Sequence, residues 1–404
     1  MRVEAEASWS TRSLSTVALC FAINMADGVD VTILSFLAPT LQREWRLGPG
    51  AMGAVFGAGL LGMALGGMGL APLADQHGRR RVILLALVLM STGMLVGSVS
   101  TSAVEFLLLR VLVGAGIGAV LAAMAALVAE CAPARHARVA VGLVQAGYPL
   151  AGVFTGLVVA RYLPSLGWHW LLAGAGMAST VLWPLAWALL KDARAVRGRE
   201  GAQRSRLGLL FAPAYRSRTL ALWGAVFCAL MVLYFVVSWI PRLAYTVGAP
   251  EARGLYAGAI YNLGAFIGTC GMSLLAMRLS LGKLVPAMAV AAALAMAALG
   301  GLALPAALTL ILVFFIGVLL QGGYNGLWPL AASIYPSSIR ATGIGWAIGI
   351  GRGGAILGPL LGGYLMSLNS PRPLLFGVFC LPLLACALLA ALAGRMVAFP
   401  FLQK

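Results

Sequence analysis

Charged side chains are scarce in this sequence, in which only 10% of the 404 residues are Asp, Glu, Lys or Arg and 61% are hydrophobic. Soluble domains carry about 25% charged residues, so a water-soluble enzyme and a disordered chain are both excluded. An outer-membrane β-barrel alternates polar and apolar residues and would not be so uniformly apolar. The composition predicts a helical protein that crosses a membrane several times.

Groups that carry catalysis or hold metals are also scarce. The 3 histidines and 6 cysteines form no C-x-x-C pair and no ligand cluster, so the cysteines are expected to be small packing residues. His77 and His136 fall in basic loops and His169 lies at the edge of a span, so none is assigned to a site. No G-x-x-x-x-G-K loop is present, which disfavours an ATP-driven pump. We expect no enzymatic activity, no metal and no cofactor.

The net charge of +17, from 28 basic and 11 acidic residues, does not indicate nucleic acid binding. Basic residues collect in the cytoplasmic loops of membrane proteins, because positively charged loops resist translocation. With both termini inside, 20 basic residues fall on the cytoplasmic side and 6 on the outer side. We therefore expect a lipid bilayer as the environment, both termini in the cytoplasm, and no nucleic acid partner.

Apolar runs long enough for a membrane helix recur along the whole chain. The run 284–339 carries no charge and is too long for one helix, so Pro305 is expected to divide it. The long polar segment 191–218 separates six spans from six. The expected spans are 14–38, 51–73, 82–102, 104–130, 138–162, 168–190, 219–243, 254–277, 284–303, 307–334, 342–367 and 373–395.

The two halves resemble each other at a fixed offset. Arg138 and Arg340 are 202 residues apart, and so are Tyr162 and Tyr364. We expect an all-α membrane protein whose twelve transmembrane helices form two pseudo-symmetric six-helix bundles, at 1–190 and 219–404, with a basic cytoplasmic linker at 191–218. Secondary transporters with such repeats rock their halves about a site near the membrane midplane.

Two aspartates lie in the middle of the first span. Asp27 and Asp30 are three residues apart and share a helix face. A charged carboxylate at mid-bilayer costs about 2.5–3.5 kcal/mol, and burial disfavours its charged form, so one of the two could exchange a proton. Together with Arg110 of the fourth span they are the candidate proton-coupling site. The alternative is a structural pair neutralised by an arginine.

Arg352 is the second arginine inside a span. A guanidinium keeps its charge, so it needs an anion, either a carboxylate of the protein or a substrate. Amides and aromatic rings inside the spans add hydrogen-bonding groups, and such a pocket suits a small aromatic carboxylate, although structural packing is the alternative for each residue. The candidate substrate-binding residues are Arg352, Gln145, Tyr148, Tyr234, Tyr261, Asn262, Tyr324, Asn325 and Trp328.

Residues 71–80 read A-P-L-A-D-Q-H-G-R-R and resemble the signature G-x-L-A-D-R-x-G-R-R of the major facilitator superfamily. The fourth span matches R-x-x-x-G-x-G-x-G from Arg110 and ends with E-x-x-P-x-R. The resemblance implies the two-bundle fold and a cytoplasmic gate, and Gln76 in place of the signature arginine implies a weaker clamp. The gating residues that it implies are Asp75, Gly78, Arg79, Arg80, Glu130 and Arg135.

Within the superfamily the chain is similar to the aromatic acid:proton symporter family. The D-G-x-D motif of that family is matched by Asp27, Gly28 and Asp30, and residues 335–359, YPSSIRATGIGWAIGIGRGGAILGP, follow its second pattern closely. The resemblance implies proton-coupled uptake of benzoate-like or hydroxycinnamate-like anions across a bacterial inner membrane. We expect a monomer. The alternative is a proton-driven exporter of drugs or other small organic molecules, although the G-x-x-x-G-P motif of such exporters is absent from the fifth span.

Overall fold

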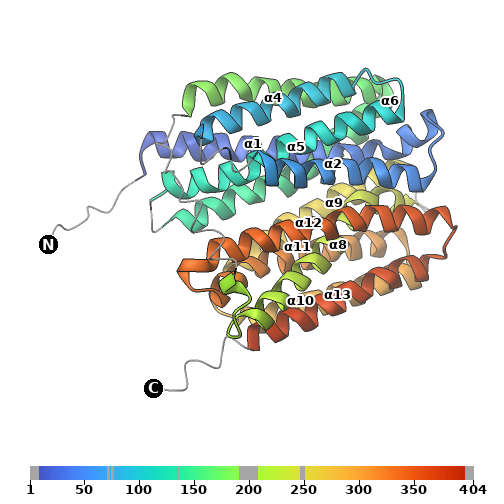
Figure 1. Cartoon of the computed structure of the whole chain (residues 1–404). Helices are drawn as coiled ribbons and strands as arrows, with labels where there is room; N and C mark the ends of the chain where they lie inside the picture. Colours follow the sequence, from blue (N-terminus) through green and yellow to red (C-terminus); the bar gives the residue numbers. More distant parts are fainter. Residues whose placement is uncertain are drawn as a thin grey trace, which may run out of the picture. The chain divides into compact units, whose positions relative to one another are not determined.

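Long helices make up almost all of the chain that the computed structural model describes, which is residues 9–70, 73, 77–133, 136–190, 208–245 and 251–395. These residues contain no strand. The helices are α1 (Thr11–Glu44), α2 (Pro49–Gly69), α4 (Arg79–Gly97), α5 (Ala103–Cys131), α6 (Ala137–Leu189), α8 (Arg216–Tyr245), α9 (Glu251–Leu275), α10 (Leu281–Gly301), α11 (Ala306–Ile334), α12 (Ser337–Ser367) and α13 (Arg372–Arg395) (Figure 1).

The membrane spans predicted from the sequence are confirmed. Within the described ranges, 11 helices are long and apolar enough to cross a membrane. One of them, α6, contains two of the predicted spans, because Gly167 breaks its helical conformation with φ 75° and ψ 169°. Glycine adopts this left-handed φ without steric cost. The break lies between the two predicted spans, the first of which ends at 162 and the second of which begins at 168.

Local sequence signals begin several of these helices. Pro305 is the N-cap residue of α11, which confirms the predicted division of the long apolar run. Pro336 occupies the same position before α12. At the start of α5, the hydroxyl of Ser102 accepts a hydrogen bond of 3.3 Å from the backbone nitrogen of Glu105, which satisfies one of the free amides that every helix start exposes.

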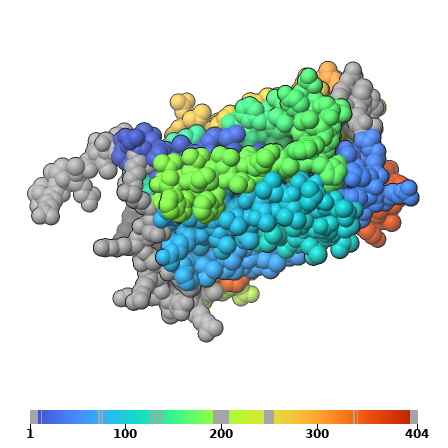
Figure 2. All heavy atoms as spheres, turned by 90° about the horizontal axis from the view of Figure 1, so that it is seen from above, coloured from blue at the N-terminus to red at the C-terminus, as the bar shows by residue number. Residues whose placement is uncertain are grey.

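The described helices belong to two compact units. Unit 1 comprises Met1–Thr40 and Ala58–Gly198, and unit 2 comprises Leu41–Gly57 and Arg199–Lys404. In unit 1, α4 packs against α5 and α6, and Figure 2 shows α4 and the second half of α6 side by side on one face. In unit 2, the main helix pairs are α9 with α11, α8 with α12 and α10 with α13.

The end of α1 and the first half of α2 group with unit 2, whereas the sequence placed them in the N-terminal bundle. The reason is close packing at Gly53, where an added Cβ atom would lie 2.8 Å from the carbonyl oxygen of Pro359. The ring of Phe56 also meets Trp239 edge to face, with centroids 5.2 Å apart. The predicted linker 191–218 stays a prediction, since residues 191–207 lie outside the described ranges.

Glycines bring helices into backbone contact at equivalent places in the two units. A Cβ atom added to Gly62 of α2 would collide with the carbonyl oxygen of Val111 on α5, and one added to Gly264 of α9 would collide with that of Phe314 on α11. The offsets are 264 − 62 = 202 and 314 − 111 = 203. The same interhelical contact is therefore built twice, which agrees with the internal repeat in the sequence.

Candidate functional site

A buried ion pair joins α1 to α5 inside unit 1. Both guanidinium amino groups of Arg110 donate to the carboxylate of Asp30, Nη1 to Oδ1 at 2.8 Å and Nη2 to Oδ2 at 3.0 Å. The side chain of Asp30 is 0% exposed and that of Arg110 is 5% exposed. Gly59 of α2 leaves room beside the guanidinium, since an added Cβ atom would lie 3.8 Å from Nη2. Asp30 is therefore held by two charge-assisted hydrogen bonds.

Asp27 lies one turn before Asp30 on α1 and is 1% exposed. Gly28 lies between them and lets α6 approach closely, because a Cβ atom at this position would lie 2.5 Å from the carbonyl oxygen of Tyr148. The central part of unit 1 therefore contains two carboxyl groups and one guanidinium. Asp30 is the carboxyl group of the two that accepts both hydrogen bonds from Arg110.

An amide pair that the sequence did not single out links α1 to α6. The Nδ2 atom of Asn24 donates to the backbone oxygen of Val144 at 2.8 Å and to Oε1 of Gln145 at 2.9 Å. Asn24 is 1% exposed. The signal that could have found it is spacing, since Asn24 lies three residues before Asp27 and shares its helix face.

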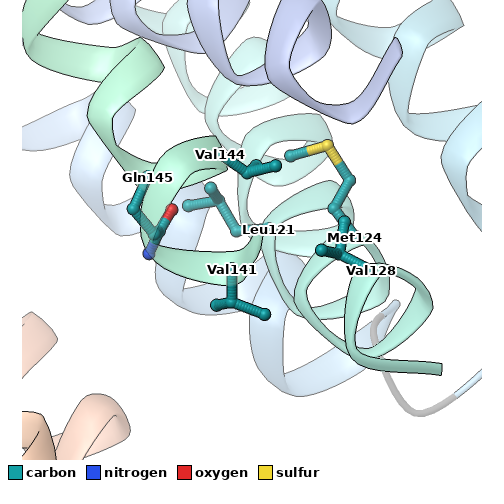
Figure 3. Close-up of a pocket in the computed structure, with 6 residues that line it drawn as sticks. All are labelled: Leu121, Met124, Val128, Val141, Val144 and Gln145. Atoms are coloured by element: carbon teal, nitrogen blue, oxygen red, sulfur yellow. The ribbon is translucent and has the colours of Figure 1, made fainter. Parts of the chain in front are cut away.

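Gln145 lines a small, partly open pocket between α5 and α6. Gln145 is solvent-exposed although it lies inside a span, and it provides the one polar side chain of the lining, as Figure 3 shows. The other lining residues are Leu121, Met124, Val128, Val141 and Val144. Its cavity volume is about 10 Å³, which is room for roughly one water molecule, so it can take one polar atom of a ligand.

Unit 2 brings an arginine and three aromatic side chains together. The Nη1 atom of Arg352 on α12 donates to the hydroxyl of Tyr234 on α8 at 3.3 Å. The hydroxyl of Tyr324 on α11 interacts electrostatically with both of them. The ring of Tyr324 meets Trp328 edge to face, with centroids 5.4 Å apart. This group of four is the arginine–aromatic cluster, and it offers a cation, hydroxyl groups and ring faces.

The charge of unit 2 makes this cluster unusual. From Arg216 to Lys404 the sequence contains a single acidic residue, Glu251, at the first position of α9. The candidate spans of α8 to α13 thus contain Arg352 and no acidic residue. A guanidinium in such surroundings is suited to receive an anion.

The other predicted residues of unit 2 lie in the contact between α9 and α11. The Nδ2 atom of Asn325 donates to the hydroxyl of Thr269 at 2.9 Å. Asn262 donates to the backbone oxygen of Gly258 in its own helix, and Tyr261 is 0% exposed. These contacts join or stiffen the two helices, and a role of the three residues in substrate binding stays a prediction.

The predicted gate is described in part. Gly78 has φ 92° and begins α4, and Arg80 donates to the backbone oxygen of Trp187 at 2.6 Å and lies over its ring. Arg79 begins the same helix. Asp75, Arg135 and the side chain of Glu130 lie outside the description. The gating assignment therefore stays a prediction.

Metal chemistry finds no support in the described ranges. They contain no group of three or more His, Cys, Asp or Glu side chains placed to hold a metal ion. All six cysteines are free thiols.

Comparisons with known proteins agree with this architecture. The model of the Major Facilitator Superfamily matches residues 19–334. The gallate transporter of Pseudomonas putida is 31% identical and aligns over 92% of this chain and 89% of its own. The 4-hydroxybenzoate transporter PcaK of Pseudomonas aeruginosa is 31% identical, with 87% and 86% covered. A crystal structure of a D-xylose–proton symporter superposes with a TM-score of 0.78 at 17% identity, covering 93% and 97%.

Proposed function

Because the chain belongs to the major facilitator superfamily, we propose that it takes up a small aromatic carboxylate together with protons by alternating access. The observation that carries the proposal is the division of charge inside the spans. Among the described residues, unit 1 buries Asp27, Asp30 and Arg110, and helices α8 to α13 hold the half-buried Arg352 in spans that contain no acidic residue. The similarity to transporters of gallate and 4-hydroxybenzoate supports an aromatic acid as the cargo.

Asp27 is the proton-carrying group in this proposal. Both oxygens of Asp30 accept hydrogen bonds from Arg110, so protonating Asp30 would break a bidentate pair and leave a buried guanidinium uncompensated. Protonation of Asp27 leaves this pair intact. Gln145 and Tyr148, on the face of α6 next to α1, are the unit 1 residues assigned to the substrate.

Arg352 binds the carboxylate of the cargo. Its fork of N–H donors matches the two oxygens of a carboxylate. The attraction between the guanidinium and the carboxylate is stronger when both groups leave water. Tyr234, Tyr324 and Trp328 supply ring faces for an aromatic cargo and hydroxyl groups for its polar edge. A benzoate-like anion contains both of the groups that this arrangement recognises.

Coupling follows from the cost of moving charge through the bilayer. With a proton on Asp27 and an anion on Arg352, neither unit carries an uncompensated charge at the midplane, and the rocking step becomes accessible. At the lower proton activity of the cytoplasm Asp27 ionises and the anion leaves. The protein acts in this scheme as a monomer in a bacterial inner membrane, with both termini in the cytoplasm.

Uptake by reconstituted protein tests the proposal. Proteoliposomes with an acidic outside and a neutral inside should accumulate labelled 4-hydroxybenzoate, and a protonophore should abolish the accumulation. Excess unlabelled benzoate should compete, and succinate should not. Arg352→Gln should raise KM at least tenfold, whereas Arg372→Gln, which removes a guanidinium bonded to a backbone oxygen of α10, should not. Accumulation that ignores the protonophore would refute proton coupling.

A further inference from the structure

We propose that Asn24 is a positioning residue that fixes the amide of Gln145 with its amino group free to bind a hydroxyl group on the ring of the cargo. This inference rests on the proposed uptake of aromatic acids, and it adds a physical reason why the protein would bind some of these acids more tightly than others. It comes from the amide pair between α1 and α6 and from the pocket that Gln145 lines.

The orientation of both amides follows from one carbonyl group. The backbone oxygen of Val144 can only accept a hydrogen bond, so the atom of Asn24 that lies 2.8 Å from it is the nitrogen. The same nitrogen lies 2.9 Å from the amide of Gln145, which must therefore present its oxygen. The Nε2 atom of Gln145 is left on the other side of the amide, and it makes no hydrogen bond to any residue that the structure describes.

Asn24 is well placed to hold this orientation. It is 1% exposed, and two acceptors share its amino group, so turning the amide over would set its oxygen against the carbonyl of Val144. A buried polar group that loses its partner costs more than a typical hydrogen bond contributes. The amide of Gln145 is thus oriented by a neighbour that has little freedom to move.

The exposed side of Gln145 faces away from lipid. Leu143 and Phe154 of α6 are 57% and 52% exposed and lie on one stripe of the helix, which is the stripe expected to meet acyl chains. Gln145 follows Leu143 by two positions, which is roughly 200° around an α-helix. An exposed amide on the opposite side of the helix from the lipid stripe is available to a polar ligand.

The chemistry of the pocket favours a hydroxyl group over a carboxylate. Its lining is apolar apart from Gln145 and contains no cation. A neutral amide donor in apolar surroundings binds a neutral acceptor without the desolvation cost of a charge. A phenolic oxygen on an aromatic ring meets this requirement, and a hydroxyl group is close in size to the single water molecule for which the pocket has room.

The test is a comparison of affinities for benzoate, 3-hydroxybenzoate and 4-hydroxybenzoate, measured by calorimetry on the purified full-length protein. Wild type should bind at least one hydroxylated acid about 3- to 10-fold more tightly than benzoate, which is the range of one neutral hydrogen bond. Asn24→Ala and Gln145→Met should both bring this ratio close to 1, because each weakens the binding of the hydroxylated acids more than that of benzoate. The double variant should show the same ratio as either single variant, because the two amides act as one unit.

Thr155→Val is the matched control, since it removes another buried polar group of α6 whose hydroxyl bonds to the backbone oxygen of Ala151 in the same helix. It should keep the wild-type ratio. A purely structural role of Asn24 would weaken all three ligands alike, and that result would overturn the inference. If Asn24→Ala or Gln145→Met still binds the hydroxylated acid more tightly than benzoate by the wild-type ratio, the inference is also overturned. If wild type binds none of the three acids, the proposed function fails, and this inference fails with it.

Discussion

At the scale of single residues, the structure separates two aspartates that look equivalent in the sequence. Asp30 accepts both hydrogen bonds of the Arg110 fork, while Asp27 lies one turn away on the same helix. A carboxylate inside a bidentate pair is stabilised in its charged form by its partner. The two residues should therefore respond differently to the same substitution.

We expect Asp30→Asn to destabilise the protein by about 3–5 kcal/mol, because it leaves the buried guanidinium of Arg110 without its counter-charge. Asp27→Asn should unfold at a temperature near that of wild type. Thermal unfolding in detergent measures this difference. The double variant Asp30→Asn/Arg110→Gln should be more stable than Asp30→Asn, and equal stability of the two aspartate variants would contradict the assignment.

The Asp27→Asn variant also separates proton coupling from translocation of the substrate. Asp27→Asn should lose accumulation driven by a pH gradient and keep exchange of labelled for unlabelled substrate across the membrane, because exchange needs no net proton transfer. Loss of both activities in a folded Asp27→Asn protein would assign Asp27 to substrate binding or to gating instead.

At the scale of helices, glycine decides how closely neighbours pack. In α9, Gly264 lies against the backbone of α11, whereas Gly271, two turns further on, has no neighbouring atom within 4 Å of an added Cβ position. Without a hydrophobic driving force between helices in lipid, such close backbone contact supplies much of the packing energy.

Gly264→Ala should lower the unfolding temperature and the yield of folded protein, because its methyl group has no room beside the carbonyl oxygen of Phe314. Gly271→Ala should be neutral or stabilise by up to about 1 kcal/mol, since alanine is the better helix former. Thermal unfolding of the two purified variants gives the comparison. Equal effects would show that α9 and α11 can separate at no cost.

At the scale of the whole molecule, charge sets the orientation in the membrane. The excess of basic residues in every second loop predicts that the turn between α1 and α2 lies outside and the turn between α9 and α10 lies inside. Gly48 and Ser280 are exposed residues of these two turns. Each offers a position where a cysteine would be accessible from one side of the membrane.

In a variant without its native cysteines, Gly48→Cys should react with a membrane-impermeant maleimide in intact cells. Ser280→Cys should react only after the cells are permeabilised. A gel-shift assay measures the maleimide labelling of both cysteine variants. Labelling of Ser280→Cys from outside would reverse the predicted topology and place the termini in the periplasm.

Hydropathy located the spans, with Pro305 dividing the one run that is too long for a single helix, since a bilayer requires each crossing segment to be apolar along its whole length and that requirement leaves a local signal. The division of α6 at Gly167 followed from the same signal, because residues around a break between spans are less apolar than the spans. The presence of Asp27, Asp30, Arg110 and Arg352 inside spans was visible for the same reason, since charge stands out against an apolar background.

The partners of those charges were decided only by tertiary structure. Arg110 meets Asp30 across 80 positions of sequence, and Arg352 meets Tyr234 across 118. Asn24 meets Gln145 across 121 positions, and its spacing from Asp27 indicates a shared helix face but not this partner. Such pairs depend on which helix faces touch and on how closely glycine lets them approach, and a one-dimensional pattern of apolar residues does not encode the distance between two helices.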